Sequence, residues 1–126
     1  MSLKNSYSKG ARFERELADL LAQRGFMVVR AAGSGVYTTA PDLLAFRKME
    51  AYVFECKAWN SKRLSLRKEQ YELLKKWEES TSVSAYVAWR VPRAGWLFIR
   101  VGELSDNASI SLEKAQLINR TVDDLV

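Results

Sequence analysis

Apolar residues recur along this chain with two periods, one of about 3.6 residues and one of two residues. Over residues 9–24 the apolar positions are spaced three and four apart, which is typical of an amphipathic helix. The stripe consists of Phe13, Leu17, Leu20, Leu21 and the aliphatic part of Arg24. Gly25 follows it directly, which predicts a helix end with a glycine cap.

Shorter apolar runs separated by turn residues predict a sheet. The expected strands are 26–30, 42–46, 51–58, 83–91 and 96–101. A connection of hairpin length, residues 47–50, joins the second and third strands. The last two are rich in β-branched and aromatic residues and flank a Pro-Arg-Ala-Gly turn at 92–95, which predicts another hairpin.

A second helix is expected from a cap at Ser65 to about Glu79. Its apolar stripe is Leu66, Leu73, Leu74 and Trp77. Beyond residue 101 the pattern is weaker: residues 109–112 alternate, and 121–126 predicts a helical turn capped by Thr121 and Asp124. The chain has no repeat, low-complexity tract or linker, so we expect one α/β domain over residues 1–126, with a small mixed sheet flanked by helices.

Composition narrows the function. The net charge of +5 favours an anionic partner, of which nucleic acid is the commonest. The chain has no histidine, which excludes Ser-His-Asp triads, Cys-His pairs and histidine-rich zinc sites. The single cysteine, Cys56, lies in an apolar run and indicates a buried thiol in a reducing cytoplasm. With no signal peptide and no run of about 20 apolar residues, we expect a soluble cytoplasmic protein without membrane contact.

Three polar residues at the ends of the second and third strands suggest chemistry. Asp42 opens one strand, and Glu55 and Lys57 share one face of the next, because side chains alternate along a strand. Two carboxylates a few ångströms apart repel each other unless a cation lies between them, and magnesium prefers oxygen ligands. A lysine beside them would supply positive charge to a phosphate. The alternative is a solvated Glu-Lys pair on an exposed strand face.

Other polar positions are open to more than one interpretation. Glu14 and Glu16 flank the stripe of the first helix on opposite sides, and periodicity does not choose which of them reaches the sheet. Gln70 falls on the core-facing stripe of the second helix, so its amide would bond either to backbone or to the acidic site. Ser34 lies between two glycines, where backbone can approach a phosphate, although such a sequence is more often just a turn.

Basic residues gather in two regions and together would follow a DNA backbone. Lys9, Arg12, Arg15 and Arg30 surround the first helix and its exit, and Arg90, Arg93 and Arg100 lie on the late hairpin. Each of these basic residues, taken alone, is interpreted as a solvated surface charge. The four tryptophans are interpreted as core or subunit-interface residues rather than as platforms for stacked bases.

Several of these segments together resemble archaeal Holliday junction resolvases, which belong to the restriction-endonuclease-like nuclease superfamily. They are the helix Lys9-Gly10-Ala11-Arg12-Phe13-Glu14-Arg15-Glu16-Leu17, then 25–30, Ala32-Gly33-Ser34, Pro41-Asp42-Leu43-Leu44-Ala45, Glu55-Cys56-Lys57 and the Gly95-Trp96 hairpin. The resemblance covers about residues 7–101, with 121–125 similar to the short closing segment.

The resemblance implies a role for each matching position. Glu14 matches the first acid of the metal site, Asp42 and Glu55 match the magnesium ligands, and Lys57 matches the catalytic lysine. Ser34 falls where family members carry a serine near the scissile strand, and Gln70 resembles a glutamine of some members that would support the site. The implied DNA-binding residues are Lys9, Arg15, Arg30, Ser34 and Arg90, the last standing where the family has a lysine.

The implied function is magnesium-dependent resolution of four-way DNA junctions, with manganese as a substitute metal. Paired cuts near the crossover call for two sites, so a nucleoid-associated homodimer is expected, with no small-molecule substrate. Three alternatives remain at this stage: another nuclease of the same fold, of restriction or repair type; a non-catalytic DNA-binding or scaffolding module; and a coincidental pattern in a basic domain that binds RNA or a protein.

Overall fold

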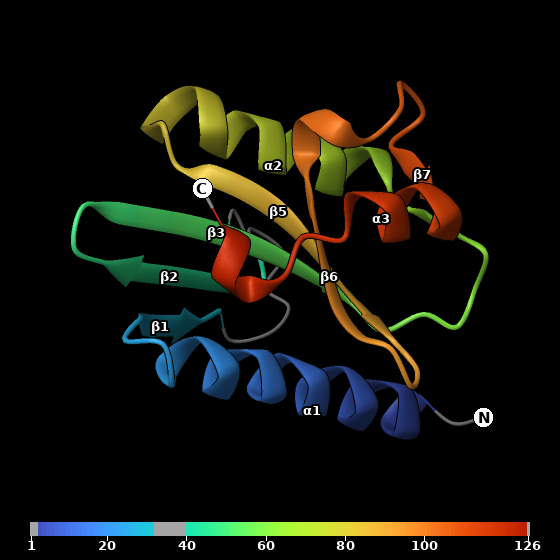
Figure 1. Cartoon of the computed structure of the whole chain (residues 1–126), viewed down its shortest axis with the longest axis horizontal. Helices are drawn as coiled ribbons and strands as arrows, with labels where there is room; N and C mark the ends of the chain where they lie inside the picture. Colours follow the sequence, from blue (N-terminus) through green and yellow to red (C-terminus); the bar gives the residue numbers. More distant parts are fainter. Residues whose placement is uncertain (1–2, 32–39, 126) are drawn as a thin grey trace.

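The computed structural model describes residues 3–31 and 40–125, which form an α/β fold with a central sheet between helices (Figure 1). In chain order the elements are α1 (Leu3–Ala22), β1 (Met27–Arg30), β2 (Leu43–Arg47), β3 (Glu50–Lys57), β4 (Arg63–Ser65), α2 (Lys68–Thr81), β5 (Ser84–Val91), β6 (Gly95–Arg100), η1 (Val101–Glu103), β7 (Ser109–Ser111), α3 (Leu112–Ile118) and η2 (Val122–Asp124), where η marks a 3-10 helix. None of the described helices is both long and apolar enough to cross a membrane.

The central sheet is mixed, with the strand order β1-β2-β3-β5-β6. Only the β3–β5 pair is parallel among its four ladders, because the chain passes through α2 between these two strands. A parallel pair needs such a crossover, whereas antiparallel neighbours are joined by short turns. The hairpins β2–β3 and β5–β6 confirm the two hairpins predicted from the sequence.

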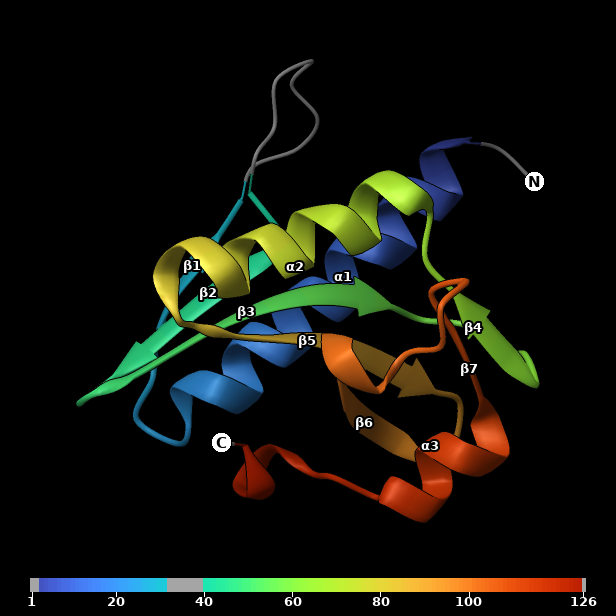
Figure 2. The ribbon, with the colours of Figure 1, turned by 90° about the horizontal axis from the view of Figure 1, so that it is seen from above.

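Helices cover the two faces of this sheet and bury a core on each side (Figure 2). On one face α1 packs its stripe residues Leu17 and Leu21 against aromatic residues of the sheet, including Phe54 and Tyr86. The opposite core lies beneath α2 and comprises Val53, Leu74, Val87, Trp89 and Ile99 among others. Because both faces are buried, the central strands β3 and β5 read as nearly continuous apolar runs.

Helix boundaries differ from the prediction at two places. The first helix already begins at Leu3 rather than near residue 9. The second begins at Lys68, and Ser65 is not its cap, which corrects the prediction. Ser65 instead belongs to β4 and pairs with Ser109 of β7, a long-range contact that no local pattern announces.

The C-terminal part contains two elements that the sequence pattern did not predict, the 3-10 helix η1 and the helix α3. Helix α3 begins after Ser111, whose Oγ accepts a hydrogen bond from the Lys114 amide at 3.1 Å. The weak alternation over 109–112 corresponds to β7. The closing helical turn is confirmed as η2, where the amide and hydroxyl of Thr121 both donate to Asp124 Oδ2 at 2.9 Å.

Candidate active site

Asp42 and Glu55 face each other at one end of the sheet, where β2 begins and β3 approaches its end. The register pairs Leu43 with Phe54, so the next residues along the two strands, Asp42 and Glu55, are opposite one another. The Cys56 amide donates to Asp42 Oδ2 at 2.8 Å. This hydrogen bond holds one carboxylate oxygen of Asp42 against the β3 backbone next to Glu55. The predicted approach of Asp42 to Glu55 across the ladder is therefore present in the structure.

Glu55 is a buried carboxyl and not part of a solvated pair. Only 8 % of the residue is exposed, beneath α2. Its neighbour Phe54 belongs to the core on the α1 side and Val53 to the core on the α2 side, which confirms the predicted alternation of faces along β3. Cys56 also points toward the α1 side, although it is half-buried rather than fully buried, because it lies near the open end of the strand.

Gln70 on α2 places its side-chain amide within hydrogen-bonding distance of Glu55. Gln70 Nε2 donates to Glu55 Oε2 at 3.2 Å, and Gln70 Oε1 accepts from the backbone amide of Arg67 at 3.2 Å. The Gln70 amide therefore bonds both to the backbone and to the acidic site, the two alternatives that the sequence left open. The same residue satisfies an orphan amide at the helix start and orients the buried carboxyl.

Burial sets the charge state of Glu55 in the metal-free protein. Desolvation, followed by the nearby negative charge of Asp42, raises the pKa of Glu55 to about 8, and the positive charge of Lys57 opposes this. A bound cation would reverse the balance, because it stabilises the ionised form of both carboxyls. The pair thus has the electrostatic character of a cation site.

Glu14 approaches the same end of the sheet from α1. Burial raises the pKa of Glu14, with a further increase from Asp42, while Arg30, whose Nε lies 3.4 Å from Glu14 Oε1, lowers it. Glu16 points elsewhere: its Oε1 accepts from Arg90 Nε at 2.7 Å and from Trp96 Nε1 at 2.8 Å. Of the two acids that the periodicity left open, Glu14 is the one near Asp42.

The donor set of the site fits a magnesium ion. Asp42 and Glu55 offer carboxylate oxygens, and magnesium is commonly held by one or two carboxylates with water and phosphate completing its shell. Within residues 3–31 and 40–125, no three His, Cys, Asp or Glu side chains gather closely enough to hold a metal by themselves. A cation at this position would therefore depend on a pair of protein ligands and on oxygen atoms from solvent or substrate.

Lys57 lies at the end of β3 on the same side as Glu55. Its Nζ is 5.6 Å from the centroid of the Trp59 ring, and its backbone pairs with Trp89 across the parallel ladder. The sequence interpretation treated Trp59 as a core or interface residue and so missed this contact. Trp59 lies beyond the end of β3 at Lys57, so the alternation of side chains along the strand did not predict the contact.

The predicted DNA-binding residues are placed in different ways. Arg15 is exposed on α1 and Arg30 is paired with Glu14, whereas Arg90 is bound to Glu16 and lies over the Phe13 ring at 5.7 Å. Arg90 is thus not an independent solvated charge. Lys9 belongs to α1, and Ser34 lies outside the described residues.

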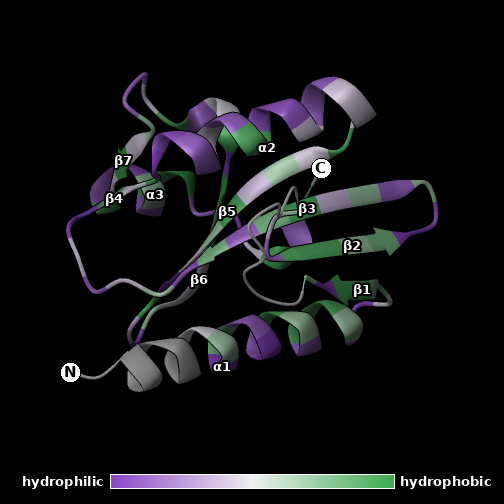
Figure 3. Cartoon of the chain, turned by 180° about the vertical axis from the view of Figure 1, so that it is seen from behind, coloured by the Kyte–Doolittle hydropathy of each residue, from purple (hydrophilic) through white to green (hydrophobic). Residues whose placement is uncertain are grey.

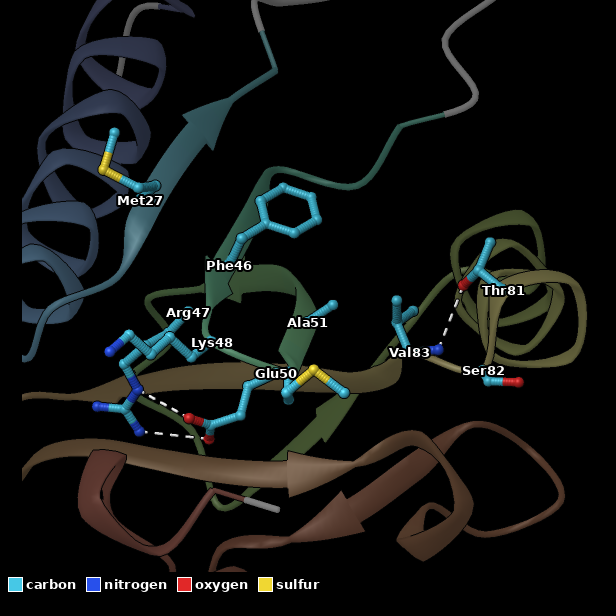
Figure 4. A pocket seen from close by; sticks show the side chains of 10 residues that line it. Met27, Phe46, Arg47, Lys48, Glu50, Ala51, Thr81, Ser82 and Val83 are labelled. Atoms are coloured by element: carbon cyan, nitrogen blue, oxygen red, sulfur yellow. Dashed lines mark hydrogen bonds and ion pairs between the residues drawn. The ribbon is translucent and has the colours of Figure 1, made fainter.

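At the far end of the β2–β3 hairpin, a hollow of about 570 Å³ lies between β1, the hairpin turn and the end of α2 (Figure 4). Met27, Phe46, Met49 and Val83 supply its apolar lining. Asp42 is separated from Lys48 by the whole length of β2, roughly 20 Å at 3.4 Å per residue. The hollow is therefore distinct from the acidic end of the sheet.

Comparison with known proteins identifies relatives of the whole chain. Residues 5–123 match the family described as archaeal Holliday junction resolvase (Hjc). The crossover junction endodeoxyribonuclease Hjc of Methanocaldococcus jannaschii is 34 % identical over 139 residues, which cover 98 % of this chain and 100 % of that protein. Its counterpart from Archaeoglobus fulgidus is 37 % identical over 95 residues, covering 75 % of this chain and 70 % of that one.

A solved structure of Archaeoglobus fulgidus Hjc, described as a Holliday junction resolvase from an archaeal hyperthermophile, has the same fold. It superposes with a TM-score of 0.82 at 30 % identity, over 92 % of this chain and 93 % of that one. The prediction of a restriction-endonuclease-like α/β nuclease fold is therefore confirmed.

Proposed function

The chain belongs to the archaeal Holliday junction resolvase family, and on this premise we propose that it cuts four-way DNA junctions at the site formed by Asp42, Glu55 and Lys57. It is a junction-resolving endodeoxyribonuclease, and the buried Glu55 opposite the partly buried Asp42, beside a lysine, is the observation that carries the assignment of its site. Glu14 and Gln70 complete the site from α1 and α2.

We propose magnesium as the cofactor, with manganese as a substitute. Asp42 and Glu55 would hold the ion, and when bound it supplies Lewis-acid stabilisation of the charge that develops on the phosphate. Supporting this, burial and the negative charge of Asp42 disfavour ionisation of Glu55 without a cation. Glu14 would act next to this pair, through its proximity to Asp42.

The protein groups have complementary roles in hydrolysis. The Asp42 and Glu55 carboxylates are held rigidly, one by the Cys56 amide and the other by Gln70, so little reorganisation is needed during reaction. Lys57 donates hydrogen bonds to the attacking water and to the phosphoryl oxygens that gain charge. A new P–O bond forms with water and the P–O3′ bond breaks, leaving a 5′-phosphate and a 3′-hydroxyl.

DNA binding is proposed to rest on phosphate contacts. Arg30 and Arg15 near the acidic end, together with Lys9 and Arg90, would follow the backbones, and Ser34 would lie beside the scissile strand. The salt links of Arg30 with Glu14 and of Arg90 with Glu16 support an ordered presentation of these guanidinium groups. Recognition by shape and phosphate predicts strong salt dependence.

We also propose that the enzyme is a homodimer. A four-way junction presents two strands for symmetric cutting, and a two-fold dimer would bring one site to each. An apolar surface supports this: Met27, Val29, Phe46 and Met49 are 76 %, 53 %, 43 % and 103 % exposed. β1 is an edge strand, and Figure 3 shows it and much of β2 in the green of apolar residues. Such an uncovered surface is typical of an interface.

Two further proposals follow from the family. Residues 1–126 would act as one nuclease domain, which the family match over residues 5–123 supports. Because chromosomal junctions are its substrate, the protein would act at the nucleoid.

The function is tested with end-labelled DNA in the presence and absence of magnesium. The purified chain is incubated with a four-way junction and, separately, with linear duplex of the same sequence. Paired nicks near the crossover of the junction alone support the proposal. Cutting of both substrates would indicate a general nuclease of this fold, and tight binding without cutting would indicate a DNA-binding module.

A further inference from the structure

Trp59 is the aromatic residue closest in sequence to the candidate catalytic lysine, and its ring faces the ammonium group. The Lys57 Nζ lies 5.6 Å from the ring centroid, within the distance at which the ring quadrupole attracts a cation. Trp59 is 38 % exposed, so the ring is not a core element of either buried cluster. Its position needs another explanation.

The backbone of Trp59 is anchored to the sheet. Its carbonyl oxygen accepts a hydrogen bond from Trp89 Nε1 at 3.0 Å, and Trp89 is fully buried on β5. Lys57 and Trp89 are also paired in the β3–β5 register. A rigid residue of the core therefore holds the chain directly after Lys57, and the Trp59 ring extends from a fixed point.

The Glu55 carboxylate competes with the Trp59 ring for the Lys57 ammonium group. Glu55 precedes Lys57 by two residues on the same face, and the positive charge of Lys57 lowers the pKa of Glu55. In the described part of the chain, however, no carboxylate lies within 4.0 Å of Lys57 Nζ. An ammonium that closed onto Glu55 would occupy the oxygen that a metal needs and would be withdrawn from the phosphate.

We propose that Trp59 is a positioning residue of this nuclease, which holds the Lys57 ammonium over its ring and away from Glu55. This inference rests on the proposed site. By offering a second favourable contact, the ring leaves the Glu55 oxygens accessible and keeps the ammonium available for the scissile phosphate. The aromatic face is the required feature, and the indole N–H is not.

The test compares Trp59→Leu with Trp59→Phe in single-turnover cleavage of a four-way junction with saturating magnesium. We expect the leucine variant to lose roughly tenfold in the cleavage rate at saturating enzyme, with an unchanged dissociation constant for the junction. The phenylalanine variant should recover most of the rate. Lys75→Met serves as the control, since it removes a comparable ammonium–ring contact, with Tyr71 at 5.1 Å, outside the site.

A double-mutant cycle identifies the residue through which Trp59 acts. In a Lys57→Met background, Trp59→Leu should cause no further loss of rate. Equal losses in both backgrounds would overturn the proposal, as would wild-type rates in Trp59→Leu. A weaker affinity for the junction at an unchanged cleavage rate would overturn the proposal and indicate that Trp59 contacts DNA directly. If both Trp59 variants had lower melting temperatures and lost the same amount of cleavage rate, the role of Trp59 would be purely structural, which would also overturn the proposal. Wild-type protein that fails to cut any junction would instead refute the proposed function.

Discussion

At the scale of single residues, the site depends on a carboxyl that the fold has buried. Glu55 accepts a hydrogen bond from Gln70 and lies opposite a second acid, Asp42. Burying an acid next to another acid is unfavourable without a compensating cation, so this pair is a poor choice for stability alone. Its arrangement is instead suited to binding a metal ion.

Substitution of either acid should separate chemistry from binding. Asp42→Asn and Glu55→Gln are expected to lower the cleavage rate by roughly 10³-fold or more, because the amides cannot hold the cofactor that stabilises the transition state. Junction binding, followed by gel shift, should survive. Glu79→Gln, an exposed position on α2, is the control. Full activity of either site variant would refute the assigned site.

The raised pKa of Glu55 predicts a pH-dependent stability of the metal-free protein. The folded-state pKa of about 8 exceeds the ordinary value of 4.5, so the folded state binds the proton more tightly than the unfolded state does. The contribution of Glu55 is fully present below pH 4.5 and is lost as the pH rises to about 8. The loss should be on the order of 2–4 kcal/mol.

Urea unfolding of wild type and Glu55→Gln in EDTA at several pH values measures this. The difference in the free energy of unfolding between the two proteins should change in favour of the glutamine variant between pH 5 and pH 9. A difference that is constant with pH would contradict the burial of an ionisable group at this position.

At the scale of elements, α2 links the start of a helix to the chemistry of a strand. Gln70 Oε1 accepts a hydrogen bond from the Arg67 backbone amide, and Gln70 Nε2 donates one to Glu55. The helix therefore covers the core and also orients the acid. Movement of the first turn of α2 would be transmitted directly to Glu55.

Two substitutions of Gln70 distinguish these two contacts. Gln70→Ala removes both, while Gln70→Glu keeps an acceptor for the Arg67 amide but replaces the donor to Glu55 by a second negative charge. We expect the cleavage rate to fall roughly tenfold or more in both variants, as loss of a hydrogen bond to a charged group predicts. If only the alanine variant lost activity, the helix start and not Glu55 would be the important contact.

At the scale of the whole molecule, the acidic site lies at one end of the β2–β3 hairpin, and Met27, Phe46 and Met49 of the apolar surface lie at the other end. This separation would allow two subunits to join through Met27, Phe46 and Met49 without covering either site. The basic residues Arg15 and Arg30 stay at or near the acidic end. Assembly and DNA binding can thus use different surfaces.

The apolar surface predicts the effect of a charge on oligomeric state. If the proposed dimer forms through this surface, Phe46→Glu should shift the protein from dimer to monomer in sedimentation velocity, because a carboxylate cannot be buried there without a partner. Leu117→Glu, on α3 and 80 % exposed in the wild type, provides a matched control and should leave the dimer intact. A dimer that is equally stable in both variants would locate the interface elsewhere.

Salt dependence tests the DNA-binding surface. Arg30→Ala should weaken binding to junctions of different sequence to a similar extent and reduce the slope of log K against log[salt] by about one. Arg63→Ala, an exposed arginine on β4, should not change the slope. An unchanged slope in the Arg30 variant would remove this residue from the set that contacts phosphate.

Local sequence patterns were sufficient for most elements, and with the family resemblance they predicted that Glu14, Asp42 and Glu55 lie near one another, while the roles of these acids stay a prediction. The hairpins follow from alternation and turn chemistry, and the 3.6-residue period found most of α1. They were not sufficient for β4 and β7, whose pairing joins residues 63–65 to 109–111, nor for the true start of α2 after Arg67. Pairing between strands so far apart in the sequence depends on how the chain folds back on itself. Patterns within a few neighbouring residues contain no information on this.

From the residues alone it follows that carboxylates, lysine and arginine would have to perform any chemistry, since histidine is absent, and that Glu55 and Lys57 share a strand face. Periodicity did not choose between Glu14 and Glu16; the family resemblance implied Glu14, and the fold places Glu14 near Asp42. The contacts of Gln70 with both backbone and acid, and of the Trp59 ring with Lys57, emerged from the packed structure. The physical reason is that periodicity fixes the face on which a side chain lies, whereas burial, charge interaction and ring contact depend on what the fold packs against that face.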